Sequence, residues 1–121
     1  MKTNHIIAWM DDLQMSAHLA KLSTIHSYEL EFRDTIDDIL KVSEAKVLII
    51  DLNSIPKKDL IKLYELKHDQ SFTCVGYCEK LNSTLINYFK GMGCDMVFKR
   101  HELMKNLGSI LIKLFNASCI P

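Results

Sequence analysis

Apolar residues along this chain repeat with two different periods, and the two periods alternate from the start of the sequence to its end. Short apolar runs predict strands, whereas longer segments with apolar residues three and four positions apart predict amphipathic helices. The predicted strands are residues 5–10, 28–32, 46–50, 72–78 and 95–98. The predicted helices are residues 13–25, 35–45, 56–68, 83–92 and 101–115.

This order of five strand–helix pairs constrains the fold more than any other feature. Strands that alternate with helices form a parallel sheet with helices on both faces and right-handed crossovers. The sequence therefore predicts an α/β sandwich of three layers. A chain of 121 residues is the size of one domain, so we expect a single domain over 1–121, with 116–121 as a short C-terminal tail.

Charge and hydropathy exclude several classes of protein. Fifteen basic residues balance fifteen acidic ones, so no net field attracts nucleic acid or an anionic membrane surface. No apolar run approaches the ~20 residues that cross a bilayer. The first residues do not resemble a signal peptide, because Asp11 and Asp12 arrive before an apolar region develops. We expect a cytoplasmic protein that binds neither nucleic acid nor membrane.

The cysteines indicate reduced thiols. Their spacing gives no CxxC pair, and a chain with this much aliphatic content needs no disulfide framework. Reduced thiols are favoured over a metal site. The four positions are Cys74, Cys78, Cys94 and Cys119.

Carboxylates follow two of the predicted strands directly. Asp11 and Asp12 follow the first strand, and Asp51 follows the third. In parallel sheets of this kind, ligands bind outside the carboxyl ends of the strands, where these acids converge if the strands are neighbours. Clustered negative charge needs a proton or a cation, and Mg²⁺ with oxygen ligands is a natural partner. Asp51 could then act as a carboxylate nucleophile and carry an aspartyl phosphate.

A structural explanation competes with this one. Asp12 can cap the first helix, and Asp11 and Asp51 can be ordinary loop acids. Three acids at the matching ends of strands in a five-fold strand–helix pattern favour a shared site at the rim over three unrelated loop acids. They do not by themselves establish phosphoryl transfer.

The segments "WMDD", "VLIIDLN" and "GCDMVFK" resemble, in this order, the acidic pair, the phospho-acceptor strand and the approach to the lysine of response-regulator receiver domains in two-component systems. The resemblance implies a flavodoxin-like sandwich with strand order 2-1-3-4-5 and five helices. It implies Mg²⁺ as cofactor, held by Asp11, Asp12, Asp51 and the backbone of Asn53.

The resemblance also implies partners. A histidine kinase or phosphotransfer protein would phosphorylate Asp51, as one step of a phosphorelay in signal transduction. A downstream protein would contact the face formed by 83–92, 95–98 and 101–115. The last helix has a wide apolar stripe in which Met104, Leu111 and Phe115 suit either a homodimer or partner surface or a broad core contact.

Two positions depart from the receiver pattern. Receivers end the fourth strand with Thr or Ser, where this chain offers Tyr77 or Cys78, and they end the fifth with lysine, where it offers Lys99 or Arg100. Two alignments remain open, Tyr77 with Lys99 or Cys78 with Arg100. Arginine is a forked donor and does not replace a point-charge ammonium at a tight phosphoryl site. Tyr77 could be a rotameric switch or an aromatic plug that closes the rim.

The first hypothesis is therefore a stand-alone receiver that accepts a phosphoryl group on Asp51 with Mg²⁺, pairs it with Lys99 or Arg100, and at most loses it by autodephosphorylation. The alternative is a pseudo-receiver, which has the same fold but regulates by binding alone. A small flavodoxin-like enzyme or cofactor binder is a weaker third hypothesis, because no glycine-rich phosphate loop follows any predicted strand.

Overall fold

The computed structural model describes residues 4–35, 47–53, 55–69 and 72–117. Its strands are β1 (His5–Trp9), β2 (Glu29–Phe32), β3 (Val47–Asp51), β4 (Thr73–Cys78) and β5 (Met96–Lys99). Its helices are α1 (Leu13–His26), α3 (Lys57–Asp69), α4 (Ser83–Gly91) and α5 (Arg100–Ala117). The predicted helix 35–45 lies outside the described residues except for its first position.

The strands form one parallel sheet in the order β2-β1-β3-β4-β5, which confirms the predicted topology. The described residues contain four of the five expected helices. Strand β1 pairs with both β2 and β3, and the ladder from β3 to β4 ends with Asp51 opposite Tyr77. The chain therefore leaves β1, β3, β4 and β5 at the same rim of the sheet.

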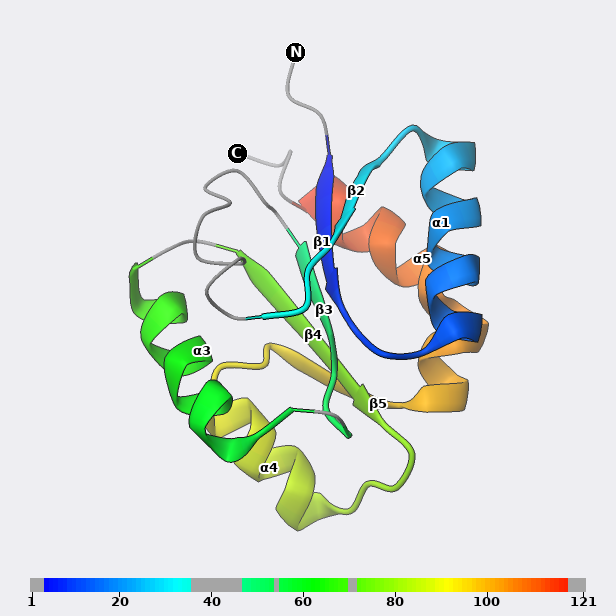
Figure 1. Cartoon of the computed structure of the whole chain (residues 1–121). Helices are drawn as coiled ribbons and strands as arrows, with labels where there is room; N and C mark the ends of the chain where they lie inside the picture. Colours follow the sequence, from blue (N-terminus) through cyan, green and yellow to red (C-terminus); the bar gives the residue numbers. More distant parts are fainter. Residues whose placement is uncertain (1–3, 36–46, 54, 70–71, 118–121) are drawn as a thin grey trace.

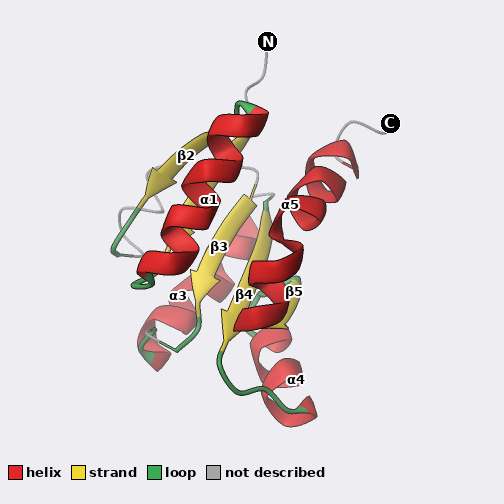
Figure 2. Ribbon diagram, turned by 90° about the vertical axis from the view of Figure 1, so that its right-hand side faces the viewer, coloured by secondary structure: helices red, strands yellow, loops and turns green. Residues whose placement is uncertain are grey.

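Helices cover both faces of this sheet. In Figure 2, α1 and α5 lie in front of the strands and α3 and α4 lie behind them, and Figure 1 shows the same two layers from the side. Because side chains alternate along a strand, Ile6 and Ala8 of β1 pack with α1 and α5, whereas Ile7 packs with α3. Two apolar clusters thus hold the three layers together.

The apolar stripe of α5 is mainly a core contact. Leu111 and Phe115 are buried in the cluster beneath α1 and α5, and Met104 packs partly against it. Ile112 is the large apolar residue of α5 that remains exposed, at 41 %. The structure therefore confirms the core explanation for Leu111 and Phe115 and leaves a homodimer as a prediction.

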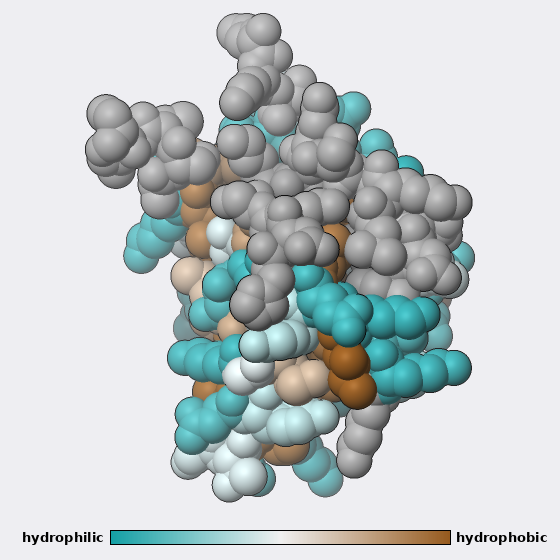
Figure 3. All heavy atoms as spheres, turned by 90° about the vertical axis from the view of Figure 1, so that its left-hand side faces the viewer, coloured by the Kyte–Doolittle hydropathy of each residue, from teal (hydrophilic) through white to brown (hydrophobic). Residues whose placement is uncertain are grey.

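The outer surface of α3 is mixed in character. Figure 3 faces the side of the molecule that carries α3, and most of the described surface there is hydrophilic, with hydrophobic residues in small patches. The large apolar residues of α3 that are exposed are Ile61 and Tyr64. Among the described helices, none combines the length and the apolar character that a membrane crossing requires.

Gly76 lets the chain fold closely over β4 at the rim. A Cβ atom at this position would lie 2.6 Å from Cδ1 of Leu52 and 3.2 Å from Sγ of Cys94. Leu52, the residue after Asp51, instead donates its backbone N–H to the carbonyl of Tyr77 at 2.8 Å. The missing side chain therefore helps to fix the position at which the chain leaves β3.

Candidate functional site

The rim at the carboxyl ends of the strands brings together most of the residues that the sequence singled out. Asp12 follows β1 and begins α1, Asp51 ends β3, and Tyr77 is the next-to-last residue of β4. Arg100, the first residue of α5, completes the group. The rim has two parts, an ion-paired corner around Asp12 and an acidic pocket around Asp51.

The Asp12 carboxylate accepts four hydrogen bonds. Its Oδ1 accepts from the backbone N–H of Met15 at 3.1 Å and from Nη2 of Arg100 at 3.0 Å. Its Oδ2 accepts from Nε of Arg100 at 2.8 Å and from the hydroxyl of Tyr77 at 3.0 Å. An ionised carboxylate offers about four acceptor positions, so this one is saturated. Asp12 therefore caps α1, as the structural explanation predicted, and holds a bidentate ion pair at once.

This environment stabilises the charged form of Asp12. Its side chain is 11 % exposed and that of Arg100 is 24 % exposed. The hydrogen bonds from Arg100, together with those from Met15 and Tyr77, outweigh burial and lower the pKa of Asp12 from 3.8 to about 2. The same pairing raises the pKa of Arg100. The ion pair is thus intact at every pH near neutrality.

Tyr77 is a fully buried hydrogen-bond donor. Burial first, and the negative charge of Asp51 second, raise the pKa of its hydroxyl well above the usual value. The ring therefore stays neutral and its proton points to Asp12. This position fits an aromatic plug that closes the rim beneath the Asp12 corner, while a rotameric switch stays a prediction.

Of the two candidate basic residues, Arg100 is the one at the Asp12 corner. Besides its two bonds to Asp12, its Nη2 donates to Oε1 of Gln14 at 2.9 Å, and its Nε lies 3.8 Å from a carboxylate oxygen of Glu79. Lys99, the last residue of β5, has an exposed side chain. Cys78 is buried, and its thiol donates to the carbonyl of Lys80 at 3.2 Å. Burial raises the pKa of this thiol.

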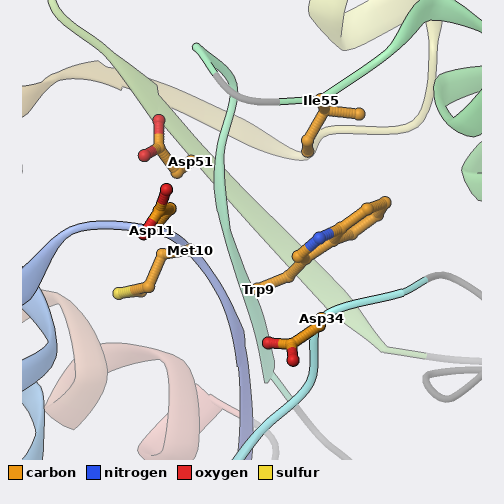
Figure 4. A pocket seen from close by; sticks show the side chains of 6 residues that line it. All are labelled: Trp9, Met10, Asp11, Asp34, Asp51 and Ile55. Carbon is orange, nitrogen blue, oxygen red and sulfur yellow. The ribbon is translucent and has the colours of Figure 1, made fainter.

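The second part of the rim is a pocket of ≈ 380 Å³. Asp51 is only 5 % exposed, and its Oδ1 accepts the backbone N–H of Asn53 at 3.1 Å. Figure 4 shows the carboxylates of Asp11 and Asp51 at one end of the pocket and the indole of Trp9 between Ile55 and Asp34 at the other. The lining residues are Trp9, Met10, Asp11, Asp34, Asp51 and Ile55.

Comparison with solved structures finds proteins whose folds are similar to that of this chain, although their sequence identity to it is low. A response regulator from Thermotoga maritima matches with a TM-score of 0.79 and 8% identity over 95% of this chain and 99% of its own. A CheY-like response regulator from Mesorhizobium loti matches with a TM-score of 0.70 and 15% identity over 93% of this chain and 99% of its own. This chain has the receiver fold.

A protein from Burkholderia pseudomallei described as pilus assembly-related has the same fold, with a TM-score of 0.73 and 18% identity over 93% of this chain and 88% of its own. No protein-family model matches the sequence, and no curated protein matches it either. At these identities the likeness concerns the receiver fold, and the chemistry of the site has to be argued from its residues.

The predicted magnesium ligands of this receiver fold are divided between the two parts of the rim. Asp11 and Asp51 line the pocket, whereas every acceptor position of Asp12 is used by Arg100, Tyr77 and Met15. Within the described part of the chain, no group of three His, Cys, Asp or Glu side chains is placed to hold a metal ion. The residues in this arrangement therefore do not fit one cation, and Mg²⁺ binding by Asp11, Asp12, Asp51 and Asn53 stays a prediction.

Sequence reasoning missed several polar residues of the rim, among them Asp34 and Gln14. Asp34 lines the pocket and follows β2 by two positions, so the rule that identified the other strand-end acids could have identified it as well. Gln14 supplies an acceptor for Arg100 from the first turn of α1. No pattern in the sequence marks Gln14, because its role depends on the position of α5.

Proposed function

We propose that this protein is a pseudo-receiver, a receiver-fold signalling module that acts through protein contact and is not switched by phosphorylation of Asp51. The observation that carries the proposal is the saturated Asp12 carboxylate. In the phosphorylation mechanism that the sequence resemblance implies, Asp12 is a metal ligand. Here the guanidinium of Arg100 supplies the positive charge from within the chain.

The energetics favour retention of this ion pair. The two bonds from Arg100 are charge-assisted and bidentate, which makes them stronger than ordinary hydrogen bonds and geometrically specific. A cation that took Asp12 as a ligand would have to displace at least one of these donors. The displaced Arg100 or Tyr77 would then lose a partner in a corner that is largely shielded from water.

In our proposal, the surface by which this module contacts a partner protein includes α4 and α5. Phe89 is the one residue of α4 that is buried, and Leu85 and Tyr88 on its outer side are 37 % and 42 % exposed. A downstream protein or a second copy of this chain could bind there. Sedimentation equilibrium of the wild type and of Tyr88→Asp separates the two cases, because a homodimer through this face would dissociate in the variant.

Phosphorylation of Asp51 is the second candidate function. It is favoured by the pocket, which places Asp51 beside Asp11 and leaves ≈ 380 Å³ of space in front of them. A histidine kinase or phosphotransfer protein would supply the phosphoryl group, and Lys99 or Arg100 would pair with it. For Arg100 this requires its release from Asp12.

A titration with Mg²⁺ and a beryllofluoride phosphoryl mimic distinguishes the two functions. Trp9 lines the same pocket as Asp51, so its fluorescence reports what enters there. We expect no saturable response in the wild type and none in Asp51→Ala. In Arg100→Ala, which frees Asp12, we expect a response to Mg²⁺ to appear.

Lys99→Ala is the matched control, because it removes a neighbouring positive charge that is exposed. It should behave like the wild type. A wild-type response that depends on both Mg²⁺ and Asp51 would refute the pseudo-receiver and establish the phospho-acceptor. A response that survives in Asp51→Ala would show binding outside the proposed phosphorylation chemistry and would leave the phospho-acceptor without support.

A further inference from the structure

Two buried thiols lie next to each other away from the rim. Sγ of Cys74, in β4, is 3.8 Å from Sγ of Cys94, which precedes β5. The side chains are 0 % and 3 % exposed, and both cysteines are free. Neither thiol takes part in the site described above, so the pair needs its own explanation.

The backbone next to the two cysteines is held together by hydrogen bonds between Cys74 and Asp95, the residue after Cys94. Asp95 donates its backbone N–H to the carbonyl of Cys74 at 2.8 Å, and its Oδ2 accepts the backbone N–H of Cys74 at 2.7 Å. Adjacent strands are ~4.8 Å apart, and disulfides join Cα atoms that are ~4.4–6.8 Å apart. Because the two Sγ atoms are already 3.8 Å apart, we expect the bond to form by side-chain rotation while β4 and β5 stay paired.

The helix that precedes Cys94, α4, has few buried residues. Phe89 is the one buried residue of α4, and its carbonyl accepts the backbone N–H of Cys94 at 3.1 Å. Elements with few buried apolar contacts open locally at low cost. Opening of α4 and the turn after it would expose Cys94 first and Cys74 behind it. Because both thiols are buried, reaction with a reagent requires this opening. The hydrogen bond with Cys94, and burial, also raise the pKa of Cys74.

We propose that Cys74 and Cys94 form an intramolecular disulfide when a low-molecular-weight disulfide supplies the oxidising equivalents. The thiolate of Cys94 attacks one sulfur of the reagent and releases one thiol, which gives a mixed disulfide on Cys94. The thiolate of Cys74 then attacks the Cys94 sulfur and releases the second thiol. The protein loses two protons and two electrons, and the reagent is reduced to two thiols.

The bond has a structural consequence that goes beyond the proposed function. It joins β4 to the turn after α4, where Gly93 has φ +113 and Met92 donates to the carbonyls of Tyr88 and Phe89. The cross-link would close the segment of chain between Cys74 and Cys94 into a loop, and this restricts the open states of that segment. Oxidation would therefore fix the C-terminal end of α4, the helix whose outer side we assign to partner contact.

The test is oxidation of the full chain with oxidised glutathione, in buffer alone and at a denaturant concentration that leaves the far-ultraviolet spectrum unchanged. We expect the protein mass to fall by two hydrogen atoms and peptide mapping to join Cys74 to Cys94. Cys78→Ser removes a third buried thiol but keeps the pair, so it should give the same product. Cys94→Ser should leave Cys74 without a partner and give no such cross-link.

Hydrogen exchange provides a second measurement. Amides at the end of α4, from Phe89 to Cys94, should exchange at least about tenfold more slowly in the oxidised protein, and this change should be absent in Cys94→Ser. The proposal is overturned if both thiols remain open to alkylation after oxidation under both conditions. It is equally overturned if mapping joins either cysteine to a different one.

Discussion

Asp12 and Asp51 are similar carboxylates, but the two parts of the rim surround them with different groups. Asp12 is surrounded by donors from α1, β4 and α5, and every acceptor position on it is used. Asp51 faces a pocket whose other acids are Asp11 and Asp34. The ion-paired corner therefore contributes stability, whereas the pocket gathers three acidic side chains that a ligand could meet.

The difference shows that adjacent residues can serve separate purposes. Asp11 and Asp12 are consecutive in the chain, yet one lines the pocket and the other caps a helix. A receiver site that gathers both acids around a cation would require Asp12 to give up at least one of its three partners. Substitutions that act on one part of the rim and spare the other measure how separate the two parts are.

The largest effect is expected for Asp12→Ala. This variant removes the cap of α1 and leaves Arg100 and Tyr77 without their acceptor, so the free energy of unfolding should fall by about 3 kcal/mol. Urea denaturation followed by circular dichroism measures it. Asp12→Asn keeps an oxygen for the cap and should lose less. Equal losses in the two variants would show that the cap oxygen contributes nothing and that the whole loss comes from the charge.

The next largest effect is expected for acidification, which should weaken the ion-paired corner around Asp12. Because the pKa of Asp12 is about 2 in the folded protein and 3.8 ordinarily, its contribution is complete above pH 4 and is lost as the pH falls through 2. The loss should amount to about 2 kcal/mol. Denaturation midpoints of the wild type and of Asp12→Asn between pH 6 and pH 2 should converge toward acid. Parallel curves would contradict the ion pair.

A smaller effect is expected for Arg100→Lys. Lysine keeps the charge but cannot place two parallel donors on Asp12 and also reach Gln14, so unfolding should become easier by about 1 kcal/mol. Lys99→Ala, next to it in the chain, should change the free energy by less than ~0.5 kcal/mol. Denaturant titrations of both variants measure the comparison. The reverse order would place Lys99, and not Arg100, in the structural role.

A small effect of either sign is expected for Asp51→Asn. The new amide oxygen can still accept the backbone N–H of Asn53, and the change removes one negative charge beside Asp11. We expect a change in unfolding free energy within about 1 kcal/mol of zero. Thermal and urea denaturation measure it. A loss as large as that of Asp12→Ala would show that the pocket is as structural as the corner.

The fold was predictable because its strands are strongly patterned. Residues 47–51 are all buried, and such a run with four apolar residues suits only a central strand of a sheet covered on both faces. The strand boundaries were less exact. The first strand ends at Trp9 and not at residue 10, because Asp12 already takes the cap position of α1 and the chain has to turn between them.

The site was predictable only in part. The strand-end rule identified Asp11, Asp12 and Asp51 as rim residues, since it depends on topology alone. It could not assign Lys99 and Arg100, because β5 ends and α5 begins between them, and consecutive residues at such a junction point in different directions. The pairing of Asp12 with Arg100 depends on how α5 packs, which no local pattern encodes.

Gly76 lies close to both the pocket and the thiol pair, because Leu52, the residue after Asp51, and Cys94 both approach it. A methyl group there would press on Leu52, which follows Asp51, and on the sulfur of Cys94 at the same time. A residue with no reactive atom thus sets the shape of two chemically unrelated places. During evolution, position 76 could gain a side chain only if the packing on both sides were remodelled together.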